Sequence, residues 1–292
     1  MGTSSPYGGP NRSPLLPSDF EDGDSSSNNP DPIQNPKENP ADRENDPADE
    51  PSRNDTEQQD SSNNPQYSDW RQAKNSMSRY AKGGGGRNGA KKAVSDYVKG
   101  HGGSHNAAKS AKSGIRTTIN IGDFFNNVSK KGISQVLTDY KISTEGKKPK
   151  EILNDIINIL APVPDSRENS IAQKALINAM SIIYEMFDDE NRDISLLNSI
   201  DQDITNKVII KYIESYLYER LIHDMGSRIE TKSANSAEAA TIEKELKEYI
   251  ESKVSTTLEG KPLTKINSET INVKVLVEGL YQQCYKVLED QL

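Results

Sequence analysis

The sequence predicts an all-α protein: a helical bundle preceded by a long disordered, acidic, Pro-rich N-terminal tail. Two observations lead to this prediction. Eleven of the fifteen prolines lie within the first 65 residues, and Ile33 is the only large aliphatic residue between Phe20 and Tyr67. From about residue 67 to residue 292, in contrast, apolar residues recur three and four positions apart, which is the period of an amphipathic helix.

The tail, residues 1–66, is expected to be disordered. It holds 4 Lys and Arg against 14 Asp and Glu, a net charge of −10. A segment with so little apolar surface cannot offset the conformational entropy that folding would cost. The mean hydropathy of the whole chain is correspondingly low, at −0.81.

Charge divides the rest of the chain into two segments. Residues 67–131 hold 13 Lys and Arg against 3 acidic residues, and residues 132–292 hold 19 against 27. We call the first segment the basic collar and the second the acidic α-helical core. This division is hidden in the overall net charge of −8.

Apolar periodicity predicts a succession of helices from the collar to the C-terminus. The first places Trp70, Ala73, Met77 and Tyr80 on one face, and Asp203 is expected to cap a long helix that runs to Ile222. The expected helices are 69–83, 90–100, 115–132, 151–160, 171–187, 203–222, 239–258 and 271–292. Glycines and prolines mark most of the breaks between them. The stretch INVKVLV (271–277) could instead form a strand.

The glycine run GGGGRNG joins the first two expected helices. It matches G-x-G-x-x-G at Gly84, Gly86 and Gly89, the fingerprint of a dinucleotide-binding loop. That fingerprint requires a strand before the loop, and here a helix precedes it. We therefore interpret the run as a flexible hinge between helices.

The sequence offers little to predict a metal or catalytic site. His101 and His105 have the spacing of metal ligands on a helix, but two glycines lie between them. His223 and Asp224 are expected near a helix end, without a Ser or Cys partner nearby in sequence. Cys284 is the single cysteine and is expected in the core. We therefore expect no metal, no cofactor and no catalytic residue, and hence a protein that is not an enzyme.

The sequence also predicts a cytoplasmic protein without membrane contact. No stretch approaches the ~18 consecutive apolar residues of a membrane span, and no apolar run follows a basic start as in a signal peptide. A lone cysteine excludes an intrachain disulfide, so nothing indicates an oxidising compartment.

The basic collar could contact nucleic acid or an acidic partner. Its cations alternate with Trp70, Tyr80 and Tyr97, which could serve as stacking platforms for bases. The alternative is that the aromatic side chains lie in the core and the cations form a solvated face. The candidate contact residues are Arg71, Lys74, Arg79, Lys82, Arg87, Lys91, Lys92 and Lys99.

The chain opens with the decamer MGTSSPYGGP. Removal of Met1 would expose the α-amine of Gly2, and an α-amine has a pKa of about 7.7–8.0, so part of it is an unprotonated nucleophile in the cell. N-myristoylation is disfavoured because Pro6 stands where that motif requires Ser or Thr.

This decamer, the acidic Pro-rich linker, the segment WRQAKNSMSRYAKGG and the helix YERLIHDMGSR together resemble the QatB family of the bacterial Qat anti-phage defence system. The resemblance implies an antiviral defence complex with an ATPase (QatA), a QueC-like enzyme (QatC) and a TatD-like nuclease (QatD). It implies no catalytic residue in this chain.

QueC enzymes activate the carboxylate of a 7-deazaguanine with ATP and transfer it to an amine. The resemblance therefore suggests Gly2 as a candidate site of 7-deazaguanine attachment. The residues that the QueC-like partner would recognise are Thr3, Ser4, Ser5, Pro6, Tyr7, Gly8, Gly9 and Pro10. A flexible tail of this length would give the terminus a reach of roughly 40–50 Å. The alternative function is a nucleic-acid-binding adaptor that recruits the TatD-like nuclease through the collar.

Overall fold

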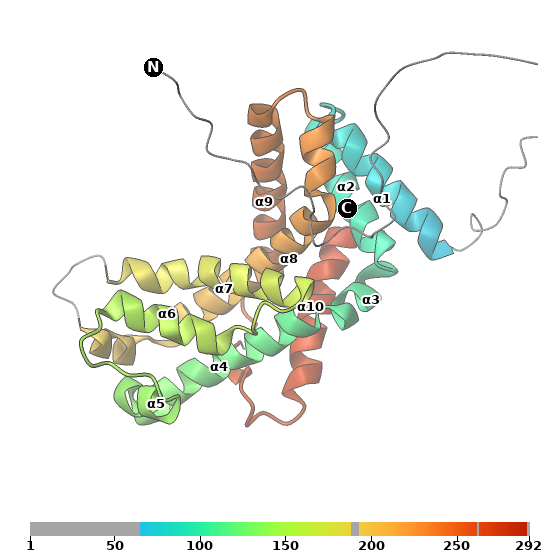
Figure 1. The fold of residues 1–292 in the computed structure, drawn as a ribbon. Helices are drawn as coiled ribbons and strands as arrows, with labels where there is room; N and C mark the ends of the chain where they lie inside the picture. The colour runs from blue at the N-terminus through green and yellow to red at the C-terminus, as the bar shows by residue number, and fades with distance from the viewer. Residues whose placement is uncertain (1–64, 188–192, 262, 291–292) are drawn as a thin grey trace, which may run out of the picture. The chain divides into compact units, whose positions relative to one another are not determined.

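The structure is a computed structural model that describes residues 65–187, 193–261 and 263–290 (Figure 1). Every regular element in these ranges is a helix, which confirms the predicted all-α fold. The elements are α1 (Pro65–Ala81), α2 (Gly86–Gly100), α3 (Gly103–Ser110), α4 (Lys112–Lys131), α5 (Ile133–Asp139), α6 (Pro149–Leu160), α7 (Arg167–Glu185), η1 (Ile194–Ser199), α8 (Gln202–Lys232), α9 (Ser236–Leu258), η2 (Leu263–Lys265) and α10 (Val273–Glu289).

The predicted disordered tail lies outside the described residues, except at its end. Helix α1 begins at Pro65, so the first helix starts slightly before the expected boundary at residue 67. The decamer MGTSSPYGGP, with Gly2, also lies outside the described residues.

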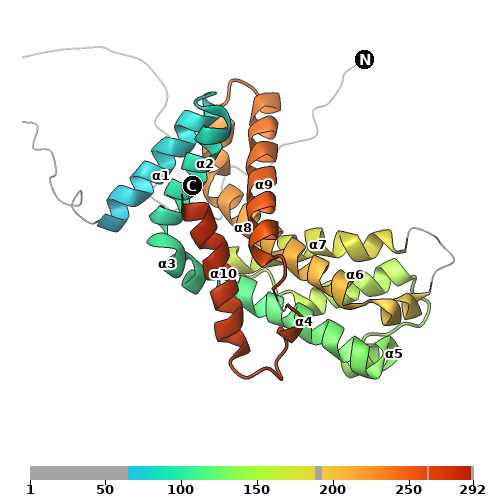
Figure 2. The same cartoon turned by 180° about the vertical axis from the view of Figure 1, so that it is seen from behind.

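Helix α8 is the central element of the helical unit. Its 31 residues span about 46 Å, and it packs against α1, α4, α7 and α9 (Figures 1 and 2). Helices α1 and α2 form an antiparallel pair at one end of α8, and α10 packs on α3, α9 and α2. The collar and the acidic core therefore share one continuous hydrophobic core.

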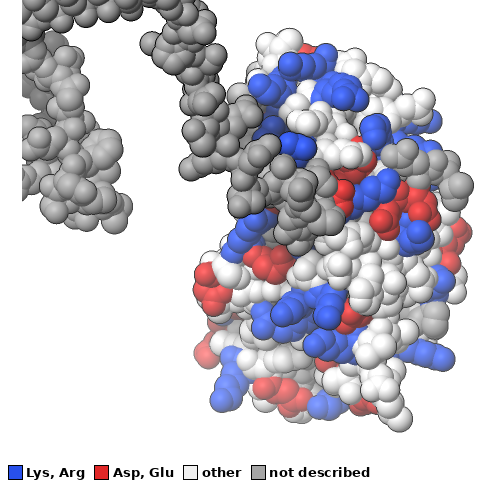
Figure 3. All heavy atoms as spheres, turned by 90° about the vertical axis from the view of Figure 1, so that its right-hand side faces the viewer, with Lys and Arg blue, Asp and Glu red and all other residues white. Residues whose placement is uncertain are grey.

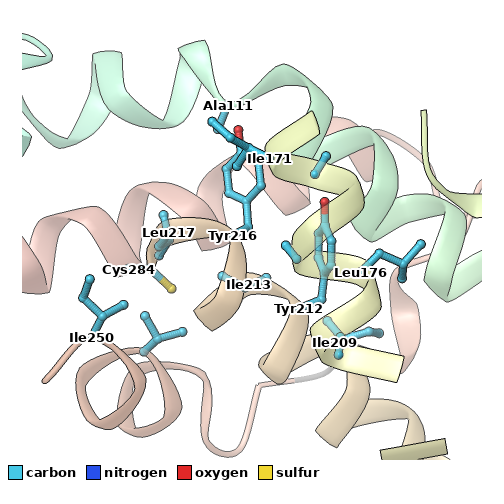
Figure 4. Close-up of a cluster of buried hydrophobic side chains, with 14 of the residues drawn as sticks. Ala111, Ile171, Leu176, Ile209, Tyr212, Ile213, Tyr216, Leu217, Ile250 and Cys284 are labelled. Carbon is cyan, nitrogen blue, oxygen red and sulfur yellow. The ribbon is translucent and has the colours of Figure 1, made fainter. Parts of the chain in front are cut away.

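Tyrosine side chains fill much of the core around α8. Tyr212 and Tyr216 extend from α8 (Figure 4), and Tyr281 and Tyr285 belong to α10; all four are buried. Figure 4 also shows Cys284 beside Leu217, in the core as predicted. The aromatic rings of Tyr216 and Tyr281 meet edge to face, with centroids 5.6 Å apart. These large side chains bury much apolar area, and the hydroxyl groups of Tyr216, Tyr281 and Tyr285 form hydrogen bonds with Glu168, Thr118 and Arg220.

Glycine lets α4 approach its neighbours closely. A Cβ on Gly114 would lie 2.6 Å from the Tyr216 ring, and a Cβ on Gly122 would overlap the carbonyl oxygen of Ile266. These two positions of α4 therefore accommodate an aromatic ring and a stretch of backbone that any side chain would displace.

The structure corrects several expected boundaries. Helices α3 and α5 are absent from the predicted set: α3 consists mostly of small residues, and α5 is only seven residues long, although its Ile133, Val136 and Leu137 have helical spacing. The helix expected from Asp203 is capped instead by Asp201, whose carboxylate accepts a hydrogen bond from the Ile204 amide at 2.8 Å. The stretch 271–277 is not a strand: α10 begins at Val273.

Candidate functional site

The collar cations differ in their exposure. Half of the eight candidates are exposed: Arg71, Arg79, Lys82 and Arg87. The other half are partly buried: Lys74, Lys91, Lys92 and Lys99. Figure 3, which views the molecule from the side of α1 and α3, shows Lys and Arg in separate groups with Asp and Glu between them. The visible Lys and Arg side chains on this face therefore do not form one continuous basic patch.

The aromatic side chains of the collar belong to the core. Tyr80 and Tyr97 are buried, and Trp70 is partly buried against Tyr97 with ring centroids 5.9 Å apart. Lys74 lies over the Trp70 ring, 5.9 Å from its centroid, as in a cation–π contact. Tyr80 and Tyr97 therefore cannot serve as stacking platforms for bases in this fold. For these two residues the alternative prediction, that the aromatic side chains lie in the core, is correct.

One collar lysine is engaged in a polar cluster between α1 and α2. Lys92 Nζ lies 3.0 Å from Asp96 Oδ2, and Asp96 also accepts hydrogen bonds from Ser76 and from Gln72. Burial would raise the pKa of Asp96, but the hydrogen bonds from Ser76, Lys92 and Gln72 hold it below its ordinary value. Lys92 therefore neutralises a buried carboxylate.

The glycine run between α1 and α2 is a tight turn. The amide of Gly83 donates to Tyr80 O at 3.0 Å, and that of Gly84 donates to Arg79 O at 3.1 Å. Helix α2 begins at Gly86, within the run, and a Cβ on Gly89 would overlap the carbonyl oxygen of Gly84. Because these amides are already engaged and a helix precedes the run, it does not form a phosphate-binding loop.

A buried carboxylate on α8 gathers polar groups from other helices. Asp224 Oδ2 accepts a hydrogen bond of 2.9 Å from Tyr97, and Asp224 Oδ1 pairs with Arg167 at the start of α7. Asp224 lies in the interior of α8, not near a helix end as expected. The cluster was not predicted, because Tyr97 and Asp224 are 127 residues apart in the sequence.

His101 lies beside this cluster, enclosed by the rings of Trp70 and Tyr97. Burial, together with the positive charges of Arg220 and Arg167, lowers the pKa of His101 to about 4. The imidazole is therefore neutral at neutral pH, and although its Nε2 lies 3.4 Å from Asp224, the two do not form an ion pair. His105, the expected second ligand of a metal pair, is exposed on α3.

Arg220 joins three helices through a second buried cluster. Its guanidinium donates to Ala107 O at 3.0 Å, to Ser110 Oγ at 2.8 Å and to Tyr285 Oη at 3.0 Å. Tyr216 donates to Glu168 on α7 in the same region. These hydrogen bonds satisfy buried polar groups and link α3, α7, α8 and α10.

The described ranges contain neither a cluster of metal-binding side chains nor a membrane-spanning helix. No group of three or more His, Cys, Asp or Glu side chains is placed to hold a metal ion within residues 65–187, 193–261 and 263–290. Over the same residues, no helix combines the length and the apolar character needed to cross a membrane.

Burial raises the pKa of the Cys284 thiol to about 12, so this cysteine is protonated at neutral pH.

Comparison with known proteins assigns the helical unit to a family. Searches of the curated proteins and of the solved structures gave no significant match. The sequence model of one family, described as Qat anti-phage system associated protein QatB, matches residues 102–288. This range is more than half of the chain and runs from the start of α3 almost to the end of α10. The chain therefore belongs to the QatB family of the Qat anti-phage system.

Proposed function

We propose that this chain is a non-enzymatic subunit of the Qat defence complex and that its Gly2 amine is modified by a QueC-like partner (QatC). The observation that carries the proposal is the decamer MGTSSPYGGP at the head of an acidic, Pro-rich segment, in a member of the QatB family. The first described helix begins at Pro65, so the acceptor is far along the chain from the buried core.

The proposed reaction forms an amide bond. The partner activates the carboxylate of a 7-deazaguanine with ATP, and the neutral amine of Gly2 attacks the activated carbonyl carbon. A C–N bond forms, the C–O bond to the nucleotide leaving group breaks, and the amine loses one proton. An α-amine suits this role because its pKa of about 7.7–8.0 leaves a larger neutral fraction than lysine has.

The test is the intact mass of the protein produced with and without the QueC-like partner. We expect a mass increase that depends on the partner and maps to the N-terminal peptide. Deletion of residues 2–10, or insertion of Lys between Met1 and Gly2, should abolish both the adduct and phage defence, because the recognised amine is lost or displaced. The melting temperature should not change. The absence of an adduct on the wild type, or full defence by these variants, would contradict the proposal.

A second candidate function, a nucleic-acid-binding adaptor for the TatD-like nuclease (QatD), is supported by the exposed collar cations. Arg71, Arg79, Lys82 and Arg87 are exposed and make no ion pair among the described residues. These side chains can contact phosphates directly, because no ion pair with an acidic side chain has to be broken first.

The adaptor is tested with the triple variant Arg71→Glu, Lys82→Glu and Arg87→Glu. Lys92 is excluded because it neutralises the buried Asp96. If the collar binds DNA, the amount of wild-type protein retained on DNA should fall steeply as the salt concentration rises. The variant should show a weaker dependence of retention on salt. The exposed lysines in Lys207→Glu, Lys232→Glu and Lys265→Glu provide a charge-matched control. Equal DNA binding by both variants would exclude this candidate.

A further inference from the structure

A groove with a volume of about 450 Å³ lies between α4, the first turn of α7 and the first turn of α10. Its walls come from segments that are far apart in the sequence. The lining residues are Lys112, Ser113, Ile115, Arg116, Ile119, Asn120, Asn169 and Lys274. None of the candidate collar residues is among them.

The charge of this groove has one sign. Lys112 and Arg116 lie one turn apart on α4, and Lys274 is the second residue of α10. All three are exposed, and none of them makes an ion pair with an acidic side chain among the described residues. No lining residue is acidic; Asp165 contacts the wall through Asn169 but forms no ion pair with the three cations, so positive charge converges on this space.

The wall of the groove is held in place by hydrogen bonds. Asn169 Oδ1 accepts from Ser113 Oγ at 2.6 Å and from Arg116 Nη2 at 3.3 Å, and Asn169 Nδ2 donates to Asp165 at 2.6 Å. Asn120 Nδ2 donates to Leu160 O at 3.0 Å. These contacts fix the guanidinium of Arg116 and the two amides before any ligand arrives, which reduces the entropy lost on binding.

The same groove carries an apolar surface. Ile115 is buried and Ile119 is partly buried, and both lie on the face of α4 that lines the groove. A ligand that carries only charge would leave this surface unused. A ligand with a flat apolar part and a charged end would use both the isoleucines and the cations.

We propose that this groove is a binding site for a phosphate-bearing nucleotide, either free or at the end of a nucleic-acid strand. The phosphates lie between Lys112, Arg116 and Lys274, and the base or sugar rests on Ile119, the partly buried isoleucine of the groove. Several cations around one space favour a multiply charged phosphate over a single carboxylate. The volume lies within the range of about 300–1,000 Å³ that is common for ligand sites. The site is independent of the proposed modification of Gly2.

The test uses the full chain, with ATP, adenosine and a short single-stranded DNA as probes in isothermal titration calorimetry at low ionic strength. The variant is Lys112→Glu with Lys274→Glu. The control is Lys207→Glu with Lys232→Glu, exposed lysines of α8 outside the groove. Wild type and control should bind ATP or the DNA, and the groove variant should bind it about tenfold or more weakly. Melting temperatures should not change, because the altered side chains are exposed.

Each outcome is decisive. ATP binding that is lost in the groove variant assigns a free nucleotide, whereas binding of DNA alone that is lost in the same variant assigns the phosphate of a strand. Equal affinity of wild type and groove variant for every probe would overturn the site, as would no binding of any probe. Adenosine that binds as tightly as ATP would also overturn it, because the phosphates would then contribute nothing.

Discussion

At the scale of single residues, Gly122 shows how closely α4 approaches its neighbours. A Cβ at this position would overlap the carbonyl oxygen of Ile266, which belongs to the backbone and cannot rotate away. Gly279 in α10 is also a helical glycine, but a Cβ there would meet nothing within 4 Å. The two positions therefore separate the cost of steric overlap from the intrinsic helix propensity of alanine.

We predict that Gly122→Ala and Gly279→Ala change stability in opposite directions. Overpacking at Gly122 should lower the free energy of unfolding by about 1–3 kcal/mol. At Gly279 alanine should raise it by about 0.5–1 kcal/mol, because glycine is the poorer helix former. Urea denaturation of both variants measures the difference. A stabilised Gly122→Ala protein would show that the approach of α4 to Ile266 is looser than described.

A second prediction concerns Glu214, a buried carboxylate of α8. Burial is the largest influence and raises the pKa of Glu214 to about 7, with the charge of Lys211 opposing and that of Glu251 assisting. The folded state thus keeps this proton up to about pH 7, whereas an unfolded chain releases it near the ordinary value of 4.5. The protonated Glu214 therefore contributes to the free energy of unfolding in full below its ordinary pKa of 4.5, and this contribution is lost as the pH rises to about 7.

Glu214→Gln should therefore stabilise the protein at pH 8 and have little effect below pH 4.5. Each kcal/mol added to the free energy of unfolding should raise the melting temperature of the helical unit by about 2–4 °C. Thermal melts at both pH values measure the difference, with the exposed Glu230→Gln as control for charge removal from the same helix. A Glu214→Gln effect that is equal at both pH values would contradict the assignment.

At the scale of elements, the start of α8 depends on one side chain. Asp201 lies outside the helix in an extended conformation, and its carboxylate accepts the Ile204 amide. Asp203, the residue expected from the sequence, lies within the first turn, where a negative charge favours the helix dipole but caps no amide. Both aspartates suit a helix start, and only the backbone conformation distinguishes them.

Removal of the Asp201 cap should cost about 1 kcal/mol of stability. We predict that Asp201→Ala is less stable than Asp201→Asn, because asparagine keeps the accepting oxygen. Asp203→Ala should cost less than Asp201→Ala. Chemical denaturation of the three variants gives the order directly, and the reverse order for the two alanine variants would place the cap at Asp203.

At the scale of the whole molecule, buried polar side chains join elements from distant parts of the chain. Arg220 links α8 to α3 and α10, and Asp224 links α8 to α2 and α7. Removing one partner of such a network leaves the other buried and unsatisfied. The collar and the acidic core are thus tied by hydrogen bonds as well as by the shared hydrophobic core.

We predict that limited proteolysis removes the chain before α1 and leaves one helical fragment that unfolds in a single cooperative transition. The expectation follows from the shared core of the described helices and from the composition of residues 1–66, where Ile33 is the only large aliphatic residue after Phe20. Mass spectrometry identifies the cut, and circular dichroism follows the unfolding. A resistant N-terminal fragment, or separate transitions for collar and core, would contradict the prediction.

Much of this fold could be predicted from the sequence, because a helix is recognised by local periodicity. Trp70, Ala73 and Met77 repeat every three or four residues, and such a pattern identifies an apolar face whatever that face contacts. The short helix α3 lacks such a pattern, because Ala107 and Ala108 are too small to mark a face clearly, whereas α5 carries Ile133, Val136 and Leu137 at helical spacing but is only seven residues long. These helices depend on packing against larger neighbours, as α3 does on α10.

The candidate sites required the packed structure. Local periodicity places Tyr97 on the apolar face of α2 with Val94 and Val98, but which residues of other helices its hydroxyl group meets depends on how the helices pack. Lys112 and Lys274 line one groove because α4 and α10 pack together, and Tyr97 meets Asp224 because of how α2 and α8 are placed. The reason is physical: backbone hydrogen bonds within a helix are local, whereas the angle and rotation of helix against helix are set by side chains far apart in the sequence.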